Sequence, residues 1–366
     1  MAYDKKSFLA GLAAGRNAES WPAMEGVNVF KFTVTAEAGT FYSPWMVFKG
    51  TIHWGDGTTS TMDNVSSLPS DWNENEAYRA RKSHTYSASG IYRIILDGEL
   101  LDWSTTRNST SMAYSDYLIS IDTPFPRSMK DKTFLYGTCY GCRSLVRLPP
   151  KLFKHCPNLA SLGWFCYRCS ALQTIPDDIF WGCYNVTNAN RFFMSCKLSE
   201  LPGNLFAQMT GLKNGAGMVS YNQDITSLPH GLLDPLQELE YFGLNSMGIT
   251  NIPVGFFANC PNMVNFENLC NADSSLTSIP EDIFWYSPEV SSFRSAFAGT
   301  GITSIPSGLF SRNLLAEDFA RCFANCEGIT GAVPELWDDF PDANGSGCFS
   351  GCINASNYED IPSGWR

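Results

Sequence analysis

Cysteine is the residue type whose spacing in this sequence most directly suggests chemistry. All 13 cysteines lie between Cys139 and Cys352, and the C-x-x-C pairs that begin at Cys139 and Cys166 are 27 residues apart. Four thiolates at such spacings can form a tetrahedral zinc site. The alternative is packing, because a buried free cysteine behaves as a small hydrophobic side chain.

Other segments place F-x-x-C where these pairs have C-x-x-C, which favours packing. Three such segments end at Cys196, Cys326 and Cys352. Where the second cysteine would stand, further copies have small polar residues that can hydrogen-bond a turning backbone, namely Asn222, Ser246 and Asp273. The odd number of cysteines and the lack of a clear export signal weigh against disulfides. We expect a ladder of free structural cysteines, with zinc or disulfides as alternatives, and no cofactor.

Residues suited to catalysis are few. The four histidines are scattered, and no nucleophile-elbow, phosphate-loop, dinucleotide or zinc-protease motif occurs. Paired carboxylates can hydrolyse glycosides, and three adjacent acidic pairs begin at Asp177, Glu281 and Asp338. The first two follow equivalent prolines, where other copies have unrelated residues, so we expect Asp177-Asp178 and Glu281-Asp282 in solvated turns. We predict no enzyme, and a polysaccharide-acting enzyme is the distant alternative.

Composition excludes several classes of function. The chain has 366 residues, 44% hydrophobic and 17% charged, which indicates a folded globular protein. Its formal net charge of −11 and the absence of a basic cluster in the sequence oppose nucleic-acid binding. No run of 18 apolar residues is present, so we predict no membrane span.

The second part of the chain is a repeat. A proline preceded by Leu, Ile or Val recurs every 24–28 residues, at Pro149, Pro176, Pro202, Pro229, Pro253, Pro280, Pro306, Pro334 and Pro362. Fixed columns of Leu, Ile and Phe stand four residues before and three and four residues after this proline. Stacked coils of this kind bury one continuous core, so each coil depends on its neighbours.

The unit L-x-x-I-P-x-x-L-F-x-x-C-x-N-L, visible at 145–159 and 249–263, resembles leucine-rich repeats of the BspA-like class. The resemblance covers about residues 115–366 and implies a solenoid with a recognition surface. The copy at Pro334 has Trp337 and Asp338 in place of Leu and Phe, and no polar capping repeat follows. We therefore expect another chain to cover the last coil.

The N-terminal region has a second signature. Residues 27–34 alternate as a strand does, and the motifs W-G-D-G-T, H-T-Y and G-x-Y-x-I follow at Trp54, His84 and Gly90. This set resembles the PKD domain, an immunoglobulin-like β-sandwich without enzymatic activity. Trp54 and Tyr86 would fill its core, Asp56-Gly57 would form a tight turn, and His84 would be structural rather than a base.

The first 26 residues predict a short amphipathic helix, for which a signal peptide is the weaker alternative. The segment resembles N-terminal segments of phage virion proteins, which implies an attachment element. Phe8, Leu9 and Leu12 would then mediate assembly. The alternative is that these side chains pack against the adjacent domain.

Ligand binding is predicted at outward positions of the coils, where residues vary between copies while the core columns do not. Aromatic rings with interspersed arginine suit glycans or proteins, and closing the ends of the core is the alternative role of each ring. The candidate residues are Tyr140, Trp164, Tyr167, Trp181, Arg191, Tyr221, Tyr241, Trp285 and Arg294.

These inferences predict a mainly β chain with short helical turns: an immunoglobulin-like β-sandwich followed by a leucine-rich-repeat solenoid. The expected divisions are an N-terminal anchor at 1–26, a sandwich at 27–105, a linker at 106–117 and about nine coils at 118–366. We expect a non-enzymatic phage virion protein, a fibre or a capsid or tail decoration, that binds host-surface or mucosal ligands. Its partners would be other virion proteins through the N-terminal helix, a host protein or glycan, and possible further copies of itself. A bacterial cell-surface adhesin is the alternative.

Overall fold

The computed structural model describes residues 26, 28–69, 75–107 and 114–366. The predicted assembly residues Phe8, Leu9 and Leu12 lie outside the described residues. The chain divides into two compact units, of which the first contains the described residues up to Val186 together with Ser195–Lys197. The second contains Thr187–Met194 and Leu198–Arg366.

The described residues are mainly β, as expected. Helix among them is limited to α2 (Leu336–Asp339) and three single 3₁₀ turns, at Glu76–Tyr78 (η1), Arg127–Met129 (η2) and Tyr358–Asp360 (η3). None of their helices is long and apolar enough to cross a membrane.

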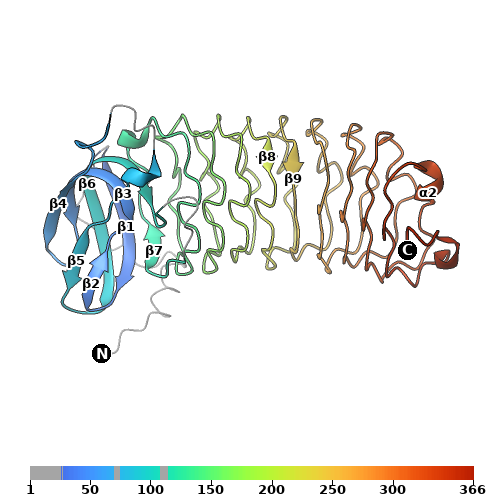
Figure 1. Ribbon diagram of the computed structural model, residues 1–366, viewed down its shortest axis with the longest axis horizontal. Helices are drawn as coiled ribbons and strands as arrows, with labels where there is room; N and C mark the ends of the chain where they lie inside the picture. Colours follow the sequence, from blue (N-terminus) through green and yellow to red (C-terminus); the bar gives the residue numbers. More distant parts are fainter. Residues whose placement is uncertain (1–25, 27, 70–74, 108–113) are drawn as a thin grey trace. The chain divides into compact units, whose positions relative to one another are not determined.

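The first unit begins with seven strands in two antiparallel sheets (Figure 1). Five strands form one sheet in the order β4-β3-β6-β1-β7, and β2 pairs with β5 in the other. The strands are β1 (Val29–Ala36), β2 (Gly39–Tyr42), β3 (Trp45–His53), β4 (Thr59–Asp63), β5 (Ser83–Tyr86), β6 (Gly90–Ser104) and β7 (Leu118–Ile121).

The core of these sheets is aromatic. Trp54 and Tyr86 are each 1% exposed, which confirms that they are core residues, and the Tyr86 hydroxyl donates to the Trp54 carbonyl at 2.8 Å. The predicted turn is present, since Gly57 at φ 87° lies between β3 and β4. His84 Nε2 is 2.7 Å from Asp56 Oδ2, and its ring stacks on Trp54 at 4.7 Å. His84 therefore holds the turn in place.

Strand β7 belongs both to the five-stranded sheet and to the repeat. It pairs antiparallel with β1, and Ser120 also forms a parallel bridge with Arg147. Further amides outside β7 tie the segment around it to the repeat, with Thr105 N donating to Thr138 O at 2.8 Å and Ser115 N to Gly141 O at 3.1 Å. The backbone groups of β7 and of the segments around it thus pair with the first coils of the repeat.

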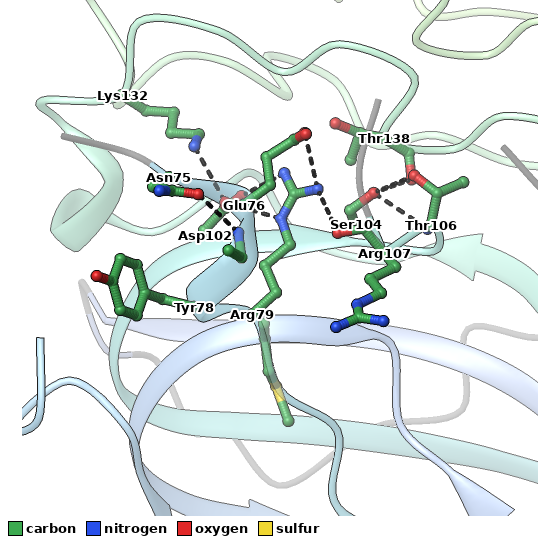
Figure 2. Close-up of polar contacts among 12 residues, drawn as sticks. Asn75, Glu76, Tyr78, Arg79, Asp102, Ser104, Thr106, Arg107, Lys132 and Thr138 are labelled. Atoms are coloured by element: carbon green, nitrogen blue, oxygen red, sulfur yellow. Dashed lines mark hydrogen bonds and ion pairs between the residues drawn. The ribbon is translucent and has the colours of Figure 1, made fainter. Parts of the chain in front are cut away.

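A buried ion cluster lies beside this junction (Figure 2). Asp102 of β6 accepts hydrogen bonds from Arg79 at 2.8 and 3.1 Å, and Lys132 Nζ lies 3.2 Å from the same carboxylate. Arg79 also pairs with Glu76 at 3.0 Å. Because the side chains of Arg79 and Asp102 are fully buried, these charges stabilise the fold only while they remain paired.

The repeat forms coils that lie side by side in each unit (Figure 1). Amides of one coil donate to carbonyls of the next, as from Leu135 to Ser161 at 3.0 Å and from Phe293 to Asp318 at 2.7 Å. The extended parts are short, and the named strands among them are β8 (Asn214–Gly215) and β9 (Tyr241–Phe242), which pair in parallel. Most of each coil is therefore turns.

The predicted core columns are buried. Residues three and four positions after the prolines from Pro149 to Pro306, such as Leu152 with Phe153 and Leu309 with Phe310, are at most 5% exposed. In the second unit Phe297, Phe323 and Phe349 form a continuous stack, with ring centroids 5.7 Å apart at both steps. Each coil thus covers an aromatic face of the one before it.

A second column bonds the turning backbone. Cys169 Sγ donates to Cys139 O, and Cys326 Sγ donates to Phe297 O, both at 3.1 Å. Asn222 does the same with its amide, donating to Phe193 O at 2.9 Å. We call this column the turn ladder. Its members are Cys142, Cys169, Cys196, Asn222, Met247, Asp273, Thr300, Cys326 and Cys352, and all of them are buried.

The assignment of Ser246 to this column is wrong by one residue. Ser246 is half-buried and has φ 51°, whereas Met247 is 4% exposed. The residue before each ladder member adopts the same left-handed conformation, as Tyr221 does at φ 62°. Because the interval between Pro229 and Pro253 is shorter than the others, aligning the coils by sequence placed Ser246 in the ladder column. Met247 occupies the column instead, and its side chain has no polar hydrogen to donate to the backbone.

The end of the chain covers the last coil. Gly347 N and Phe349 N donate to the carbonyls of Gly364 and Trp365, at 3.2 and 2.8 Å. The Trp337 ring lies edge-on to Trp365 at 6.4 Å. Trp337, which departs from the repeat pattern, therefore packs against Trp365 beside the last coil. The cover of this coil by another chain stays a prediction.

Replacing Asp102 with alanine tests the ion cluster. The change leaves Arg79 and Lys132 buried without their carboxylate, so we expect the free energy of unfolding to fall by about 3–5 kcal/mol. Exposed Asp116, which pairs with Arg143, is the control, and its alanine variant should lose under about 1 kcal/mol. Urea unfolding followed by tryptophan fluorescence measures both, and equal losses would contradict this role.

The ladder member Asp273 predicts a specific pH dependence. Burial raises its pKa to about 7, and the backbone amides of Ser275 and Ile249 offset only part of that rise. Since the protonated form is favoured in the fold, the free energy of unfolding should decline by a few kcal/mol, on the order of the pKa change, as pH rises from about 4 to about 7. Asp273→Asn, which copies Asn222, should abolish this decline and stabilise the protein most above pH 7. Denaturant unfolding of both proteins across this pH range provides the test, and an unchanged slope in the variant would count against it.

Candidate functional site

The coils present side chains from two left-handed backbone positions that lie four residues apart. The first position has φ between 54° and 62° in eight coils, at Gly137, Trp164, Arg191, Gly217, Asn268, Ser295, Arg321 and Gly347. Glycine adopts this conformation without strain, whereas other residues pay a steric cost of about 1–2 kcal/mol. Trp164 and Arg191 at the first position, and Tyr221 at the second, thus occupy strained sites that glycine fills in other coils. Backbone strain of this kind is concentrated at functional sites, so these three side chains are candidates for binding.

In the first unit, three predicted binding residues belong to one aromatic cluster. Trp164 lies 6.2 Å from Tyr140 and 4.7 Å from Tyr167, and Tyr140 is 5.2 Å from Tyr167. Tyr136 and Tyr114 extend the cluster, at 6.3 Å from Trp164 and Tyr140 respectively. The result is a continuous surface of rings whose outermost member, Tyr114, is 50% exposed.

Two arginines border this aromatic cluster. Arg168 donates to the Tyr114 hydroxyl at 2.6 Å and lies 5.1 Å above the Tyr167 ring. Arg143 lies 4.8 Å above the ring of Tyr114. Burial raises the pKa of Tyr140, so its hydroxyl remains a neutral donor at physiological pH. Rings, hydroxyls and guanidinium groups together suit a polar ligand with flat apolar faces.

In the second unit, three other predicted residues line one cavity of about 350 Å³: Arg191, Tyr221 and Tyr241. Its remaining polar lining comes largely from side-chain amides and one carboxylate, those of Asn245, Asn265, Asn268, Asn271 and Glu267. We call it the amide cavity. Its volume lies within the usual range of small-molecule sites.

The polar groups of the amide cavity are held by one another. Asn271 Nδ2 donates to Asn268 Oδ1 at 2.9 Å, and Glu267 Oε1 accepts from Ser292 at 2.9 Å. Asn268 has φ 54°, a conformation that asparagine tolerates better than most residues. Amides in fixed positions between two tyrosines present paired donors and acceptors beside aromatic faces, which is the chemistry that binds sugar hydroxyls and ring faces.

The other predicted residues belong to neither site. Trp181 is 45% exposed with Lys151 Nζ 4.6 Å above its ring, and Trp285 is half-buried beside Arg312 at 5.0 Å. Arg294 is engaged in an ion pair with Asp318 at 2.7 Å. Each of these three residues is thus in contact with a charged side chain outside the aromatic cluster and the cavity.

Two exposure predictions are wrong. Tyr167 is only 9% exposed because the rings of Tyr140 and Trp164 cover it. Asp178 and Asp282 are half-buried rather than solvated, and Asp282 Oδ2 accepts from Gly255 N of the preceding coil at 2.9 Å. This carboxylate therefore bonds the backbone between coils.

Sequence reasoning missed Tyr114, Tyr136 and the asparagines of the amide cavity. The signal that could have found the amides is the repeat register, since Asn245 and Asn271 stand at the position that Tyr140 and Tyr167 occupy in earlier coils. Tyr114 carries no such signal, because it precedes the repeat.

The cysteines are all free and buried in the structure. Burial raises the pKa of Cys139 and Cys169 well above the ordinary thiol value, and hydrogen bonds link them to Cys142 and Cys166. Among the described residues, no group of three or more His, Cys, Asp or Glu is arranged to hold a metal ion. The thiols of the ladder thus act as weak donors to the backbone.

Comparison with known proteins adds two solved structures of repeat proteins. No family model matches the chain, and no curated protein matches it significantly. The chain is similar to a chain of the Drosophila Toll–Spätzle complex, with 17% identity and TM-score 0.43 over 60% of this chain and 34% of that one. It is also similar to a leucine-rich-repeat protein of Leptospira interrogans, with 17% identity and TM-score 0.40 over 58% of this chain and 51% of that one.

Because this chain spans no more than about half of either protein and both TM-scores are below 0.5, the function proposed below rests on the chain's own residues.

Backbone strain at Arg191 can be separated from its side chain. We expect Arg191→Gly to be more stable than Arg191→Ala by about 0.5–1 kcal/mol, because only alanine keeps a β-carbon at this left-handed position. Thermal unfolding of the two variants measures the difference. A more stable alanine variant would show that this backbone is not strained.

Proposed function

We propose that this chain is a non-enzymatic recognition protein that binds glycans of a host or mucosal surface through the outer face of its coils. The amide cavity supports this most directly, because Arg191, Tyr221 and Tyr241 converge there with four asparagines and Glu267.

The finer architecture is part of the proposal. We infer that the coils form a BspA-like leucine-rich-repeat solenoid, supported by the 24–28-residue period and the buried columns. We also infer that the N-terminal sheets form a PKD-like, immunoglobulin-like sandwich. Buried Trp54 and Tyr86 and the turn at Asp56-Gly57 support this inference.

The setting we propose is a phage virion, with the chain as a fibre or as a capsid or tail decoration. Its support is the resemblance of the N-terminal segment to phage virion proteins, in which Phe8, Leu9 and Leu12 would contact other virion proteins. A bacterial cell-surface adhesin is the alternative, and it would use the same outer face of the coils.

Removing the tyrosines of the amide cavity tests glycan binding. We expect the variant Tyr221→Gly with Tyr241→Ala to bind immobilised mucin about tenfold more weakly than the unmodified chain, since each ring contributes about 0.5–1.5 kcal/mol beyond its buried area. Glycine is chosen at 221 because Gly141, Gly299 and Gly351 adopt the same backbone conformation in other coils. Surface plasmon resonance and an oligosaccharide array provide the readouts.

The matched control is Tyr286→Ala, which removes an exposed tyrosine of the same unit outside the amide cavity. Its binding should be unchanged. Equal losses in both variants would overturn the assignment of the cavity, and hydrolysis of a polysaccharide that Asp178→Asn abolishes would favour the enzyme instead.

A further inference from the structure

A second cavity, of about 590 Å³, lies in the first unit, away from the aromatic cluster. Lys31 of β1, Arg127 at the start of η2, and the adjacent Lys154 and His155 of the first coil contribute to its lining. These residues come from three segments that are far apart in the sequence, so sequence analysis finds no basic cluster. We call this the cationic cavity.

The charge of the cationic cavity is unbalanced. No aspartate or glutamate is among its described lining residues. Within the described ranges, Lys31, Arg127 and Lys154 form no ion pair, although the chain as a whole carries a formal charge of −11. Burial and the nearby charges of Lys154 and Arg127 lower the pKa of His155, which is the response of an imidazole to a positive potential.

The remaining lining completes a site for an organic anion. Thr123 Oγ1 accepts a hydrogen bond from Lys31 N at 2.9 Å, which leaves the threonine hydroxyl hydrogen able to donate. Half-buried Val29 and Pro124 form an apolar wall. Two ammonium groups, a guanidinium and a hydroxyl can bind the oxygens of one multiply charged group, and the wall can contact the ring or chain that bears it.

We propose that the cationic cavity binds the oxyanion group of a phosphate or sulfate ester, such as a charged sugar. This site is independent of the glycan binding proposed for the amide cavity. Phosphate and sulfate esters share a tetrahedral array of oxygens, so the structure assigns the class of ligand and the experiment distinguishes its two sources.

The test is calorimetric titration of the full chain at low ionic strength with glucose 6-phosphate, glucose 6-sulfate, glucuronate and uncharged glucose. We expect saturable binding of at least one of the two esters and about tenfold weaker binding in the double variant Arg127→Gln with Lys154→Gln. The matched control, Lys49→Gln with Lys213→Gln, removes the same charge at exposed lysines paired with Asp63 and Glu240. Its affinity should change by less than about twofold.

Imidazole NMR spectra locate the ligand, since the chain has only four histidines. The ester should shift the His155 resonances and leave those of exposed His230 unchanged. The ester that binds more tightly identifies the source of the oxyanion. Equal affinities in the two double variants, binding of glucose or glucuronate as tight as that of the esters, an unshifted His155, or no saturable ester binding would each overturn the proposal.

Discussion

Hydrogen bonds between successive coils are the constraint on which the repeat depends. The turns of a coil pair part of its amides internally, as from Cys156 N to Phe153 O, whereas other amides, such as Leu135 N, pair with a carbonyl of the next coil. The turn ladder completes this pairing with side chains. The Cys169 thiol and the Asn222 amide each donate to a carbonyl of the preceding coil, whereas the Thr300 hydroxyl donates to Phe297 O of its own coil. Asp273 lacks such a donor unless protonated, and burial raises the pKa of its carboxyl to about 7.

The same coil geometry shapes the outer surface. Each tight turn requires left-handed residues, and these occur at fixed intervals in coil after coil. Because only the inward columns are restricted by packing, the residues at and beside the left-handed positions are free to vary. These variable residues form the aromatic cluster around Trp164 in the first unit and the amide cavity beside Tyr221 in the second. One backbone design therefore supports two different surface chemistries.

Much of the fold could be predicted, in the coils because burial repeats with the period, and in the N-terminal region because short motifs mark the turn and its core. The columns of Leu152 and Phe153, the buried Trp54 and Tyr86, and the turn at Gly57 are all as expected. Prediction failed where a neighbour decides the outcome. Tyr167 is covered by adjacent rings, Asp282 bonds the preceding coil, and a short interval displaced the alignment of Ser246 by one residue. Of the nine predicted binding residues, three meet in the aromatic cluster and three line the amide cavity.

The sequence alone determined which residues recur, and hence the mainly β class and the inward columns, since periodic burial leaves a periodic pattern. Only the tertiary structure decided which non-periodic residues meet. Arg79, Asp102 and Lys132 come from separate segments, as do Lys31, Arg127 and His155. Their charges are close because β7 joins the five-stranded sheet to the first coil. Spacing along the chain does not encode contacts made by that junction, so no sequence pattern could reveal them.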